Sequence, residues 1–321
     1  MQEEIMKYVE LGTTGEQVSL VALGCLSLTP SAKERSIATV HRAYELGITL
    51  YDTADIYGEG ESEKILGEAI REGNIPREKV IIASKCAALR YENVYTWNLS
   101  ASYIKECCEG SLKRLGMEYI DLYQPHRIDY LAHPEETARA LEDLKAEGKI
   151  RHVGVSNYSP DEIRAISAYT RVETLQTLFH LLIQEPLEVG LAAVCLEKKM
   201  NMLCYSPLAG GLLTGNKPLP HTFDQGYGDW QEQREQGVVA QVKIVAERYG
   251  VTPGQISLAW LMALPGGVIP LVGTGNPDHI EEGAKAADIT LERDDWYELA
   301  IIGRGRRMRW RGRPYVYLKD R

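Results

Sequence analysis

The sequence lacks the features that would place the protein in a membrane, outside the cell or on nucleic acid. No apolar run approaches the roughly 20 residues that span a bilayer. The first residues, MQEEIMKYVE, are acidic where an export signal is basic and then apolar. Acidic residues outnumber basic ones by 45 to 36, whereas phosphate binding needs a basic surface. We therefore predict a cytoplasmic protein without a membrane or nucleic-acid partner.

Cysteines are also sparse. The chain has six in 321 residues, too few for a disulfide scaffold, and none of them forms a C-x-x-C pair. We expect reduced thiols and no bound metal. No low-complexity linker divides the chain, so we predict one domain over residues 1–303, followed by an arginine-rich tail over residues 304–321.

What the sequence does contain is a regular alternation of short apolar runs and longer stretches with helical spacing. The apolar runs are SLVALG, ITLYD, KVIIASK, YIDLYQPH, IRHVGVS, VETLQT, MNMLCYS and GGVIPLVG. Helical patterns between them, such as residues 32–47, 100–116 and 133–148, end in glycine. Eight such units in about 250 residues are typical of a (β/α)8 TIM barrel, an α/β fold that buries parallel strands on both faces.

Three further features refine this fold prediction. Residues 8–23 have the pattern of a hairpin that caps the bottom of the barrel. Residues 214–237 form a long loop after the seventh strand, at the mouth of the barrel. A doubly wound fold fits less well, because the first strand-to-helix junction, ALGCLSLTPS, has no G-x-G-x-x-G motif.

Four ionisable residues stand at or after predicted strand ends. Asp52, Lys85 and His126 end the second, third and fourth strands, and Tyr57 lies in the loop after the second. A tyrosine donates a proton poorly at neutral pH unless a nearby cation stabilises its phenolate. Lys85 would be that cation, Asp52 would hold its ammonium group, and His126 would orient a substrate oxygen.

Two other aspartates of the same regions have simpler interpretations. Asp55 is expected to form a local turn. Asp121 lies in the middle of a predicted strand, where a carboxylate is expected to satisfy buried donors.

These motifs resemble the aldo-keto reductases, a barrel family that reduces carbonyls with a nicotinamide cofactor and no metal. The stretch YDTADIYGEGESEKILGEAI resembles the family segment with its Asp and Tyr, and LEDLKAEGKIRHVGVSNYSPDEI resembles the segment after the fourth strand. The resemblance covers nearly the whole chain. It implies hydride transfer to a carbonyl carbon of an aldehyde, ketone or sugar, with Tyr57 as the acid.

The resemblance also assigns cofactor contacts. Ser156, Asn157 and Gln176 would hold the nicotinamide carboxamide, and Tyr205 would stack on its ring. Ser206 and Leu208 would contact the pyrophosphate side, and Gly24 and Cys25 would lie near the cofactor. The implied contacts around the adenosine are Gly273, Thr274, Asn276, His279 and Glu282.

The cofactor is predicted to be NADPH from the family, with NADH as the alternative. Residues 268–283 contain no Lys or Arg to hold a 2′-phosphate, and they add Asp278.

The substrate pocket would be lined by Trp97, Arg127 and Trp230. Arg127 fits an oxygen-rich or anionic substrate, and it equally fits a structural salt bridge. For the arginine-rich tail we consider a cover over the pocket, a subunit contact, a cofactor contact and a solvated end.

Two other functions are compatible with parts of the pattern. The same fold could serve as a cofactor-binding redox sensor or regulatory subunit. A glycoside hydrolase barrel would pair Asp52 with Glu59 or Glu61, and would leave Tyr57 and Lys85 without a role.

Overall fold

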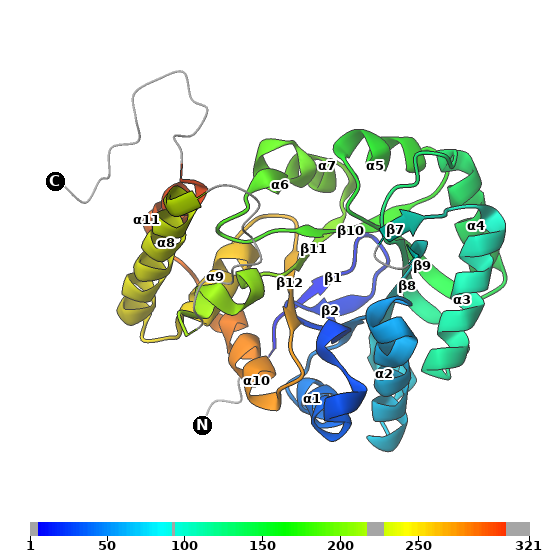
Figure 1. Ribbon diagram of the computed structural model, residues 1–321, viewed down its shortest axis with the longest axis horizontal. Helices are drawn as coiled ribbons and strands as arrows, with labels where there is room; N and C mark the ends of the chain where they lie inside the picture. The colour runs from blue at the N-terminus through cyan, green and yellow to red at the C-terminus, as the bar shows by residue number, and fades with distance from the viewer. Residues whose placement is uncertain (1–5, 92–93, 217–227, 306–321) are drawn as a thin grey trace.

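The centre of the molecule is a closed barrel of parallel strands (Figure 1). The computed structural model describes residues 6–91, 94–216 and 228–305. Around the barrel, the strands are β3 (Ala22–Gly24), β4 (Leu50–Asp52), β5 (Ile81–Cys86), β8 (Ile120–Pro125), β9 (Ile150–Ser156), β10 (Val172–Leu178), β11 (Asn201–Tyr205) and β12 (Val268–Gly273). β12 pairs with β3 and closes the ring. Each strand falls within or overlaps one of the predicted apolar runs, so the predicted (β/α)8 barrel is confirmed.

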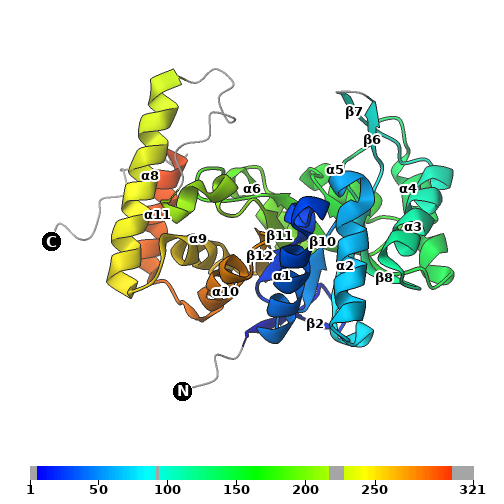
Figure 2. The same cartoon turned by 60° about the horizontal axis from the view of Figure 1, so that its bottom comes forward.

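Helices surround the barrel in the order expected for such a fold (Figure 1). They are α1 (Lys33–Glu45), α2 (Glu61–Glu72), α3 (Ala101–Leu115), α4 (Pro134–Ala146), α5 (Pro160–Ile166), α6 (Glu185–Glu188), α7 (Leu191–Lys198), α9 (Pro253–Met262) and α10 (Pro277–Lys285). Gly116 ends α3 in the left-handed region, with φ 65°, which glycine adopts without steric penalty. Two further helices, α8 (Gly228–Tyr249) and α11 (Arg293–Arg304), pack against each other at one side of the molecule (Figure 2).

Two hairpins lie at opposite ends of the barrel (Figure 2). The N-terminal one, β1 (Tyr8–Glu10) with β2 (Gln17–Ser19), is the predicted cap. Its Leu11 and Val18 pack against barrel-lining residues such as Leu50 and Leu203, which closes the bottom. The other hairpin, β6 (Ala88–Tyr91) with β7 (Val94–Trp97), follows β5 and was not predicted.

The inside of the barrel changes from apolar to polar along its axis. Leu50, Ile81, Leu122, Leu203 and Ile269 fill the end beside the N-terminal hairpin. Toward the carboxyl ends of the strands the buried side chains are polar or charged, and they include Asp52, Lys85, Gln124, Ser156 and Gln176. Buried polar groups need partners or a function. This gradient therefore marks the carboxyl end of the barrel as the place for a site.

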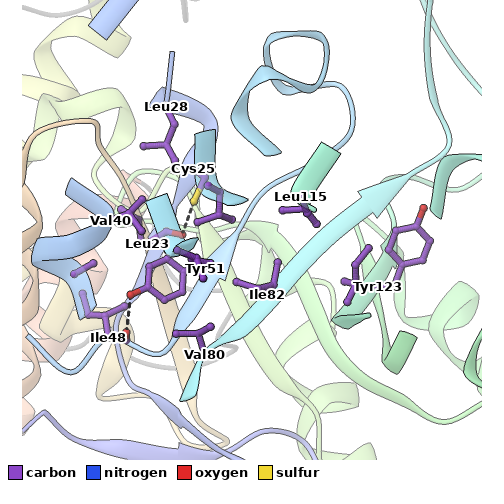
Figure 3. Packing of buried hydrophobic residues seen from close by; sticks show 14 of the residues in the cluster. Leu23, Cys25, Leu28, Val40, Ile48, Tyr51, Val80, Ile82, Leu115 and Tyr123 are labelled. Atoms are coloured by element: carbon purple, nitrogen blue, oxygen red, sulfur yellow. Dashed lines mark hydrogen bonds between the residues drawn. The ribbon is translucent and has the colours of Figure 1, made fainter. Parts of the chain in front are cut away.

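The main hydrophobic core lies between the strands and the surrounding helices. Figure 3 shows one part of it, in which Val40 of α1 and Leu115 of α3 belong to the same cluster as Leu23 and Ile82 of the barrel. The hydroxyl of Tyr51 lies in this core and donates to the backbone oxygen of Ile48, at 3.0 Å. Asp121 of β8 accepts hydrogen bonds from Arg77 and from the backbone of Ile82, so its predicted structural role is confirmed.

Two sequence predictions need revision near the C-terminus. The loop predicted over residues 214–237 is shorter, because α8 begins at Gly228; residues 217–227 lie outside the described part of the chain. The predicted tail starts one residue too early, since Arg304 is the last residue of α11 and its Nη2 lies 2.7 Å from Oε1 of Glu188. Residues 306–321 are also outside the described part. No helix among the described residues is long and apolar enough to cross a membrane.

Candidate active site

Three neighbouring strands bring the predicted catalytic residues to one end of the barrel. Asp52 is the last residue of β4, and His126 directly follows β8. Lys85 is the last residue but one of β5, which runs one residue further than predicted. β5 pairs in parallel with both β4 and β8, so the carboxyl ends of the three strands adjoin. Tyr57 begins a short 3-10 helix, η3 (Tyr57–Gly60), in the loop after β4.

Lys85 is the centre of this cluster. Its Nζ donates to Oδ2 of Asp52 at 2.8 Å, to the backbone oxygen of Thr53 at 2.7 Å and to the hydroxyl of Tyr57 at 3.1 Å. These three acceptors use all the donors of an ammonium group. Burial opposes the charge, but Asp52 and Tyr57 outweigh it and raise the pKa of Lys85 above its ordinary value. The site therefore holds a buried cation directly beside the phenol.

The pKa of Tyr57 moves in the direction opposite to the prediction. Burial raises the pKa of this phenol above its usual value, and the lowering effect of Lys85 offsets only part of the rise. Desolvation of the buried phenol has a larger effect on this pKa than the cation beside it. Tyr57 is thus protonated at neutral pH, which is the form that a proton donor needs. Lys85, 4.7 Å from the ring centroid, is placed to stabilise the phenolate when the proton leaves.

His126 is held as a neutral imidazole. Burial, with smaller effects of Lys85 and Arg127, lowers the pKa of His126 to about 3. Its ring lies edge-on to that of Tyr57, with centroids 5.9 Å apart. Nδ1 is buried without a hydrogen-bond partner in the described part of the chain. A neutral imidazole beside a phenol can donate a hydrogen bond to a substrate oxygen, so the geometry is compatible with the predicted orienting role.

Gln176 makes a contact that the sequence did not reveal. Its amide nitrogen donates to Oδ1 of Asp52 at 2.7 Å, while Lys85 occupies the other oxygen. Asp52 is buried, with 3% of its surface exposed. A carboxylate saturated in this way is poorly suited to act on a sugar bond. Glu61, one of its suggested partners, is paired with Lys64, so the geometry gives no support to the glycoside hydrolase hypothesis.

The predicted nicotinamide contacts form a second cluster beside the first. Oδ1 of Asn157 accepts from the hydroxyl of Tyr205 at 2.9 Å. Its amide nitrogen donates to the hydroxyl of Ser156 at 2.9 Å and to the backbone oxygen of His126 at 3.2 Å. Asn157 has φ 57°, in the left-handed region that Asn tolerates better than most residues. Strands β8, β9 and β11 are thereby linked at the mouth of the barrel.

Four predicted cofactor contacts lie at or just past the ends of β3 and β11, and they differ in how exposed they are to solvent. Gly24 aligns with Gly273 in the pairing of β3 with β12. Ser206 is exposed with φ 52°, and Leu208 is partly buried. The Cys25 thiol is fully buried in the core, where it donates to the backbone oxygen of Leu23 (Figure 3). Core residues cover the sulfur, so the predicted proximity of Cys25 to the cofactor, which stays a prediction, would involve its backbone.

The predicted adenosine region spans the end of β12 and the start of α10. Asn276 caps α10 by accepting from the backbone of Asp278 at 3.2 Å, and Thr274 lies 3.4 Å from Nδ1 of His279. Glu282 accepts a hydrogen bond from Thr252 at 2.6 Å, so it also ties α10 to the start of α9.

Together these residues fit a dinucleotide. Amides and a phenol surround the place predicted for the nicotinamide, and a helix N-terminus, which favours anions, stands at the place predicted for the adenosine phosphate.

Two of the three predicted pocket residues lie next to His126. The Trp97 ring is 6.5 Å from the His126 ring, and the guanidinium carbon of Arg127 is 5.4 Å from the centroid of the Trp97 ring. Trp230 belongs to α8 rather than to a loop. The Trp230 side chain lies outside the described side chains, so its predicted place in the pocket stays a prediction.

Asp55 has a role that the sequence did not suggest. It lies in a turn, as predicted, but Oδ1 of its carboxyl group is buried and has no hydrogen-bond partner in the described part of the chain. Burial and the nearby Glu63 raise its pKa to about 7, although Arg114 and Cys107 oppose the rise. A charge therefore forms beneath the Tyr57 loop close to neutral pH.

This raised pKa predicts a pH-dependent stability. The folded state holds the Asp55 proton more tightly than the unfolded chain, whose Asp pKa is about 3.9. The contribution of Asp55 is therefore full below about pH 4 and is lost as the pH rises through about 7. The wild type should therefore lose unfolding free energy between about pH 5 and about pH 8. In Asp55→Asn this loss should be smaller by about 2 to 3 kcal/mol.

Urea unfolding at the two pH values measures this difference. Asp161→Asn, which changes an aspartate with 96% of its side chain exposed, is the matched control. It should lose as much unfolding free energy between the two pH values as the wild type does. If Asp55→Asn also lost as much unfolding free energy as the wild type, another group would be responsible for the pH dependence of stability.

Comparison with known proteins adds to this geometry. A family model described as "Aldo/keto reductase family" matches residues 20–304. The chain is 33% identical over 309 residues to a 6-dehydroglucose reductase of Novosphingobium aromaticivorans, covering 93% of this chain and 96% of the relative. It is 32% identical over 296 residues to an NADP(+) aldo-keto reductase of Schizosaccharomyces pombe, covering 86% of each. The structure of a glycerol dehydrogenase of Gluconobacter oxydans matches with a TM-score of 0.82 and 26% identity, over 94% of this chain and 95% of that one.

Proposed function

The chain belongs to the aldo/keto reductase family of NAD(P)-dependent oxidoreductases, and we propose that it reduces a carbonyl group with Tyr57 as the proton donor. The substrate class is an aldehyde, ketone or sugar, and the reverse oxidation of an alcohol uses the same groups. The observation that carries this proposal is the bond of 3.1 Å between the Lys85 ammonium and the Tyr57 hydroxyl, with the ammonium also held by Asp52.

Each side chain has one task in the proposed reaction. When bound, the reduced nicotinamide supplies a hydride to the carbonyl carbon. His126 donates a hydrogen bond to the carbonyl oxygen and holds it near the phenol. Tyr57 transfers its proton to that oxygen as negative charge develops there. Lys85 stabilises the phenolate that remains, and Asp52 with Gln176 keeps the ammonium in place.

Burial of the cluster supports this division of tasks. Lys85 and Asp52 expose 0% and 4% of their side chains, so water screens their interactions weakly. A charge-assisted contact in such surroundings acts strongly on the phenolate and needs no rearrangement during the reaction. The neutral His126 adds no competing positive charge beside Lys85.

The test of this function is turnover on a panel of carbonyl compounds. The purified protein is mixed with NADPH or NADH and with aldehydes, ketones and sugars, and nicotinamide absorbance is followed. Reduction of at least one class is expected. Tight cofactor binding without turnover on any carbonyl would instead support the sensor or regulatory-subunit hypothesis.

We further propose NADPH as the preferred cofactor. The S. pombe relative carries NADP(+) in its name. The N-terminus of α10 offers a partial positive charge where the family resemblance puts the 2′-phosphate. Asp278, in the first turn of that helix, opposes the phosphate, and no Lys or Arg occurs over residues 268–283. The preference should therefore be modest.

Removing the charge of Asp278 should strengthen the preference for NADPH over NADH. Asp278→Asn is expected to tighten NADPH binding by about 2- to 5-fold, since an exposed charge interaction is worth about 0.5 to 1 kcal/mol. NADH binding should change less, because it lacks the phosphate. Tryptophan fluorescence titration measures both dissociation constants. Asp294→Asn, at the start of α11, is the matched first-turn control. Equal effects on both cofactors would contradict a phosphate beside Asp278.

A further inference from the structure

Arg127 is an exposed cation just past the carboxyl end of β8, beside the predicted catalytic residues. It directly follows His126. Its guanidinium carbon lies 5.4 Å from the centroid of the Trp97 ring, and that ring is 6.5 Å from the ring of His126. Contact with an aromatic face orients a guanidinium group and leaves its N–H edges available for other partners.

The charge of Arg127 acts on two predicted site residues. After burial and Lys85, it is the third cause that lowers the pKa of His126. Burial raises the pKa of Tyr205, and Arg127 is the group that opposes the rise. His126 directly follows β8 and Tyr205 ends β11, and Asn157 is hydrogen-bonded to both, so the two residues lie together at the carboxyl end of the barrel.

No carboxylate among the described residues neutralises this cation. The nearest acidic residue along the chain, Asp129, accepts from the backbone nitrogens of Leu99 and Leu131, each at 2.9 Å. The ion pairs in the described part of the chain do not include Arg127, whose guanidinium group instead lies over the ring of Trp97. The structural salt bridge considered from the sequence is therefore wrong for the described residues.

We propose that Arg127 recognises an anionic group on the substrate, so that the preferred substrates are carbonyl compounds with a carboxylate or phosphate. This inference rests on the proposed reductase function and narrows its substrate class. A planar guanidinium binds carboxylate or phosphate oxygens through two parallel hydrogen bonds. With the carbonyl oxygen at Tyr57 and His126, the anion at Arg127 would fix the other end of the substrate and align the carbonyl carbon.

Matched substrate pairs test this proposal. The carboxylate arm compares 4-carboxybenzaldehyde with methyl 4-formylbenzoate, and the phosphate arm compares glyceraldehyde 3-phosphate with glyceraldehyde. The wild-type enzyme should have a higher kcat/KM for the anionic member of at least one pair, and the arm that responds identifies the anion. In Arg127→Met, kcat/KM for that anion should fall by about 10- to 100-fold, while the neutral member should change by less than about 3-fold.

Three comparisons make the result specific. Arg127→Lys, which keeps the charge without the planar fork, should lie between the wild type and Arg127→Met. Arg139→Met removes a guanidinium group on α4 whose side chain is 76% exposed. This control should leave kcat/KM for both substrates of a pair unchanged. The preference for the anion should also weaken as salt is added.

The outcomes separate this inference from the proposed function. Turnover of both members of each pair with equal efficiency, or an anion preference that survives in Arg127→Met, overturns the role of Arg127 and leaves the reductase function intact. Absence of turnover on every pair and on the wider carbonyl panel contradicts the function, and the inference falls with it.

Discussion

Tyr57→Phe should reduce turnover of any carbonyl substrate by about 10²- to 10⁴-fold, the usual contribution of general acid catalysis. The phenol is the proton donor in the proposed reaction, and the variant removes its hydroxyl but keeps its ring. Cofactor binding should be nearly unchanged, since the described hydrogen bond of that hydroxyl is to Lys85. The loss should therefore fall on kcat, measured from nicotinamide absorbance at saturating cofactor and substrate.

A matched control separates this effect from a general change in packing. Tyr158 is 3% exposed, and its hydroxyl has no hydrogen-bond partner in the described part of the chain. Tyr158→Phe removes the same atom from a nearby buried tyrosine and should keep wild-type turnover. If Tyr57→Phe also retained full activity, the proton would have to come from another group, and the proposed mechanism would be wrong.

Lys85→Met should lose both activity and stability. The substitution leaves the buried Asp52 carboxylate with Gln176 as its side-chain partner in the described part of the chain. Removal of one member of a buried ion pair costs about 3 to 5 kcal/mol, because the other charge stays desolvated. Turnover should fall at least as far as in Tyr57→Phe, since no cation then stabilises the phenolate. Urea unfolding and steady-state kinetics measure the two losses.

The pH dependence of this stability loss follows from the direction of the Lys85 shift. The pKa of Lys85 is raised in the folded state, above an unfolded value of about 10.4. Its stabilising contribution is therefore complete below about pH 10 and is lost only as the pH rises through the folded value. Lys85 itself should therefore add no pH dependence to the stability difference between the wild type and Lys85→Met across the neutral range. A change in that difference there would come from another group, above all the Asp52 carboxylate that the variant leaves buried without its cation.

A double variant distinguishes the catalytic role of Lys85 from its structural one. Lys85→Met combined with Asp52→Asn removes both charges of the buried pair, so much of the lost stability should return. Activity should not return, because the ammonium beside Tyr57 is still absent. Recovery of turnover in the double variant would show that Lys85 acts only by keeping Asp52 neutralised.

The fold could be predicted from local patterns because each strand and helix has its own periodicity. Apolar runs such as KVIIASK are too short for helices and lack the helical spacing of apolar residues that an amphipathic helix shows. Glycines such as Gly116 end the helices between these runs. The β6–β7 hairpin could not be predicted in this way. Its two strands have four residues each and pair with each other outside the barrel, so they share no alternation with the main pattern.

The order of elements also explains why the predicted active-site residues could be grouped from the sequence. In a parallel barrel all carboxyl ends face one way, so residues at those ends converge without any knowledge of distances. Asp52, Lys85 and His126 could therefore be grouped from the chain alone, and so could Asn157 and Tyr205. The convergence is a property of the topology, which the succession of strands and helices specifies.

Other properties depend on how far apart atoms lie after folding and on how much water reaches them. The bond from Gln176 to Asp52 joins residues 124 positions apart, and no local motif encodes it. The raised pKa of Tyr57 reflects a balance of burial against one cation. The lack of an ion pair at Arg127 among the described residues reflects which of their carboxylates are out of reach. Distances and desolvation arise only when the whole chain packs. The reaction class could therefore be inferred before folding was considered, whereas the directions of the pKa shifts, and our proposal of an anion rather than a salt bridge at Arg127, required the coordinates.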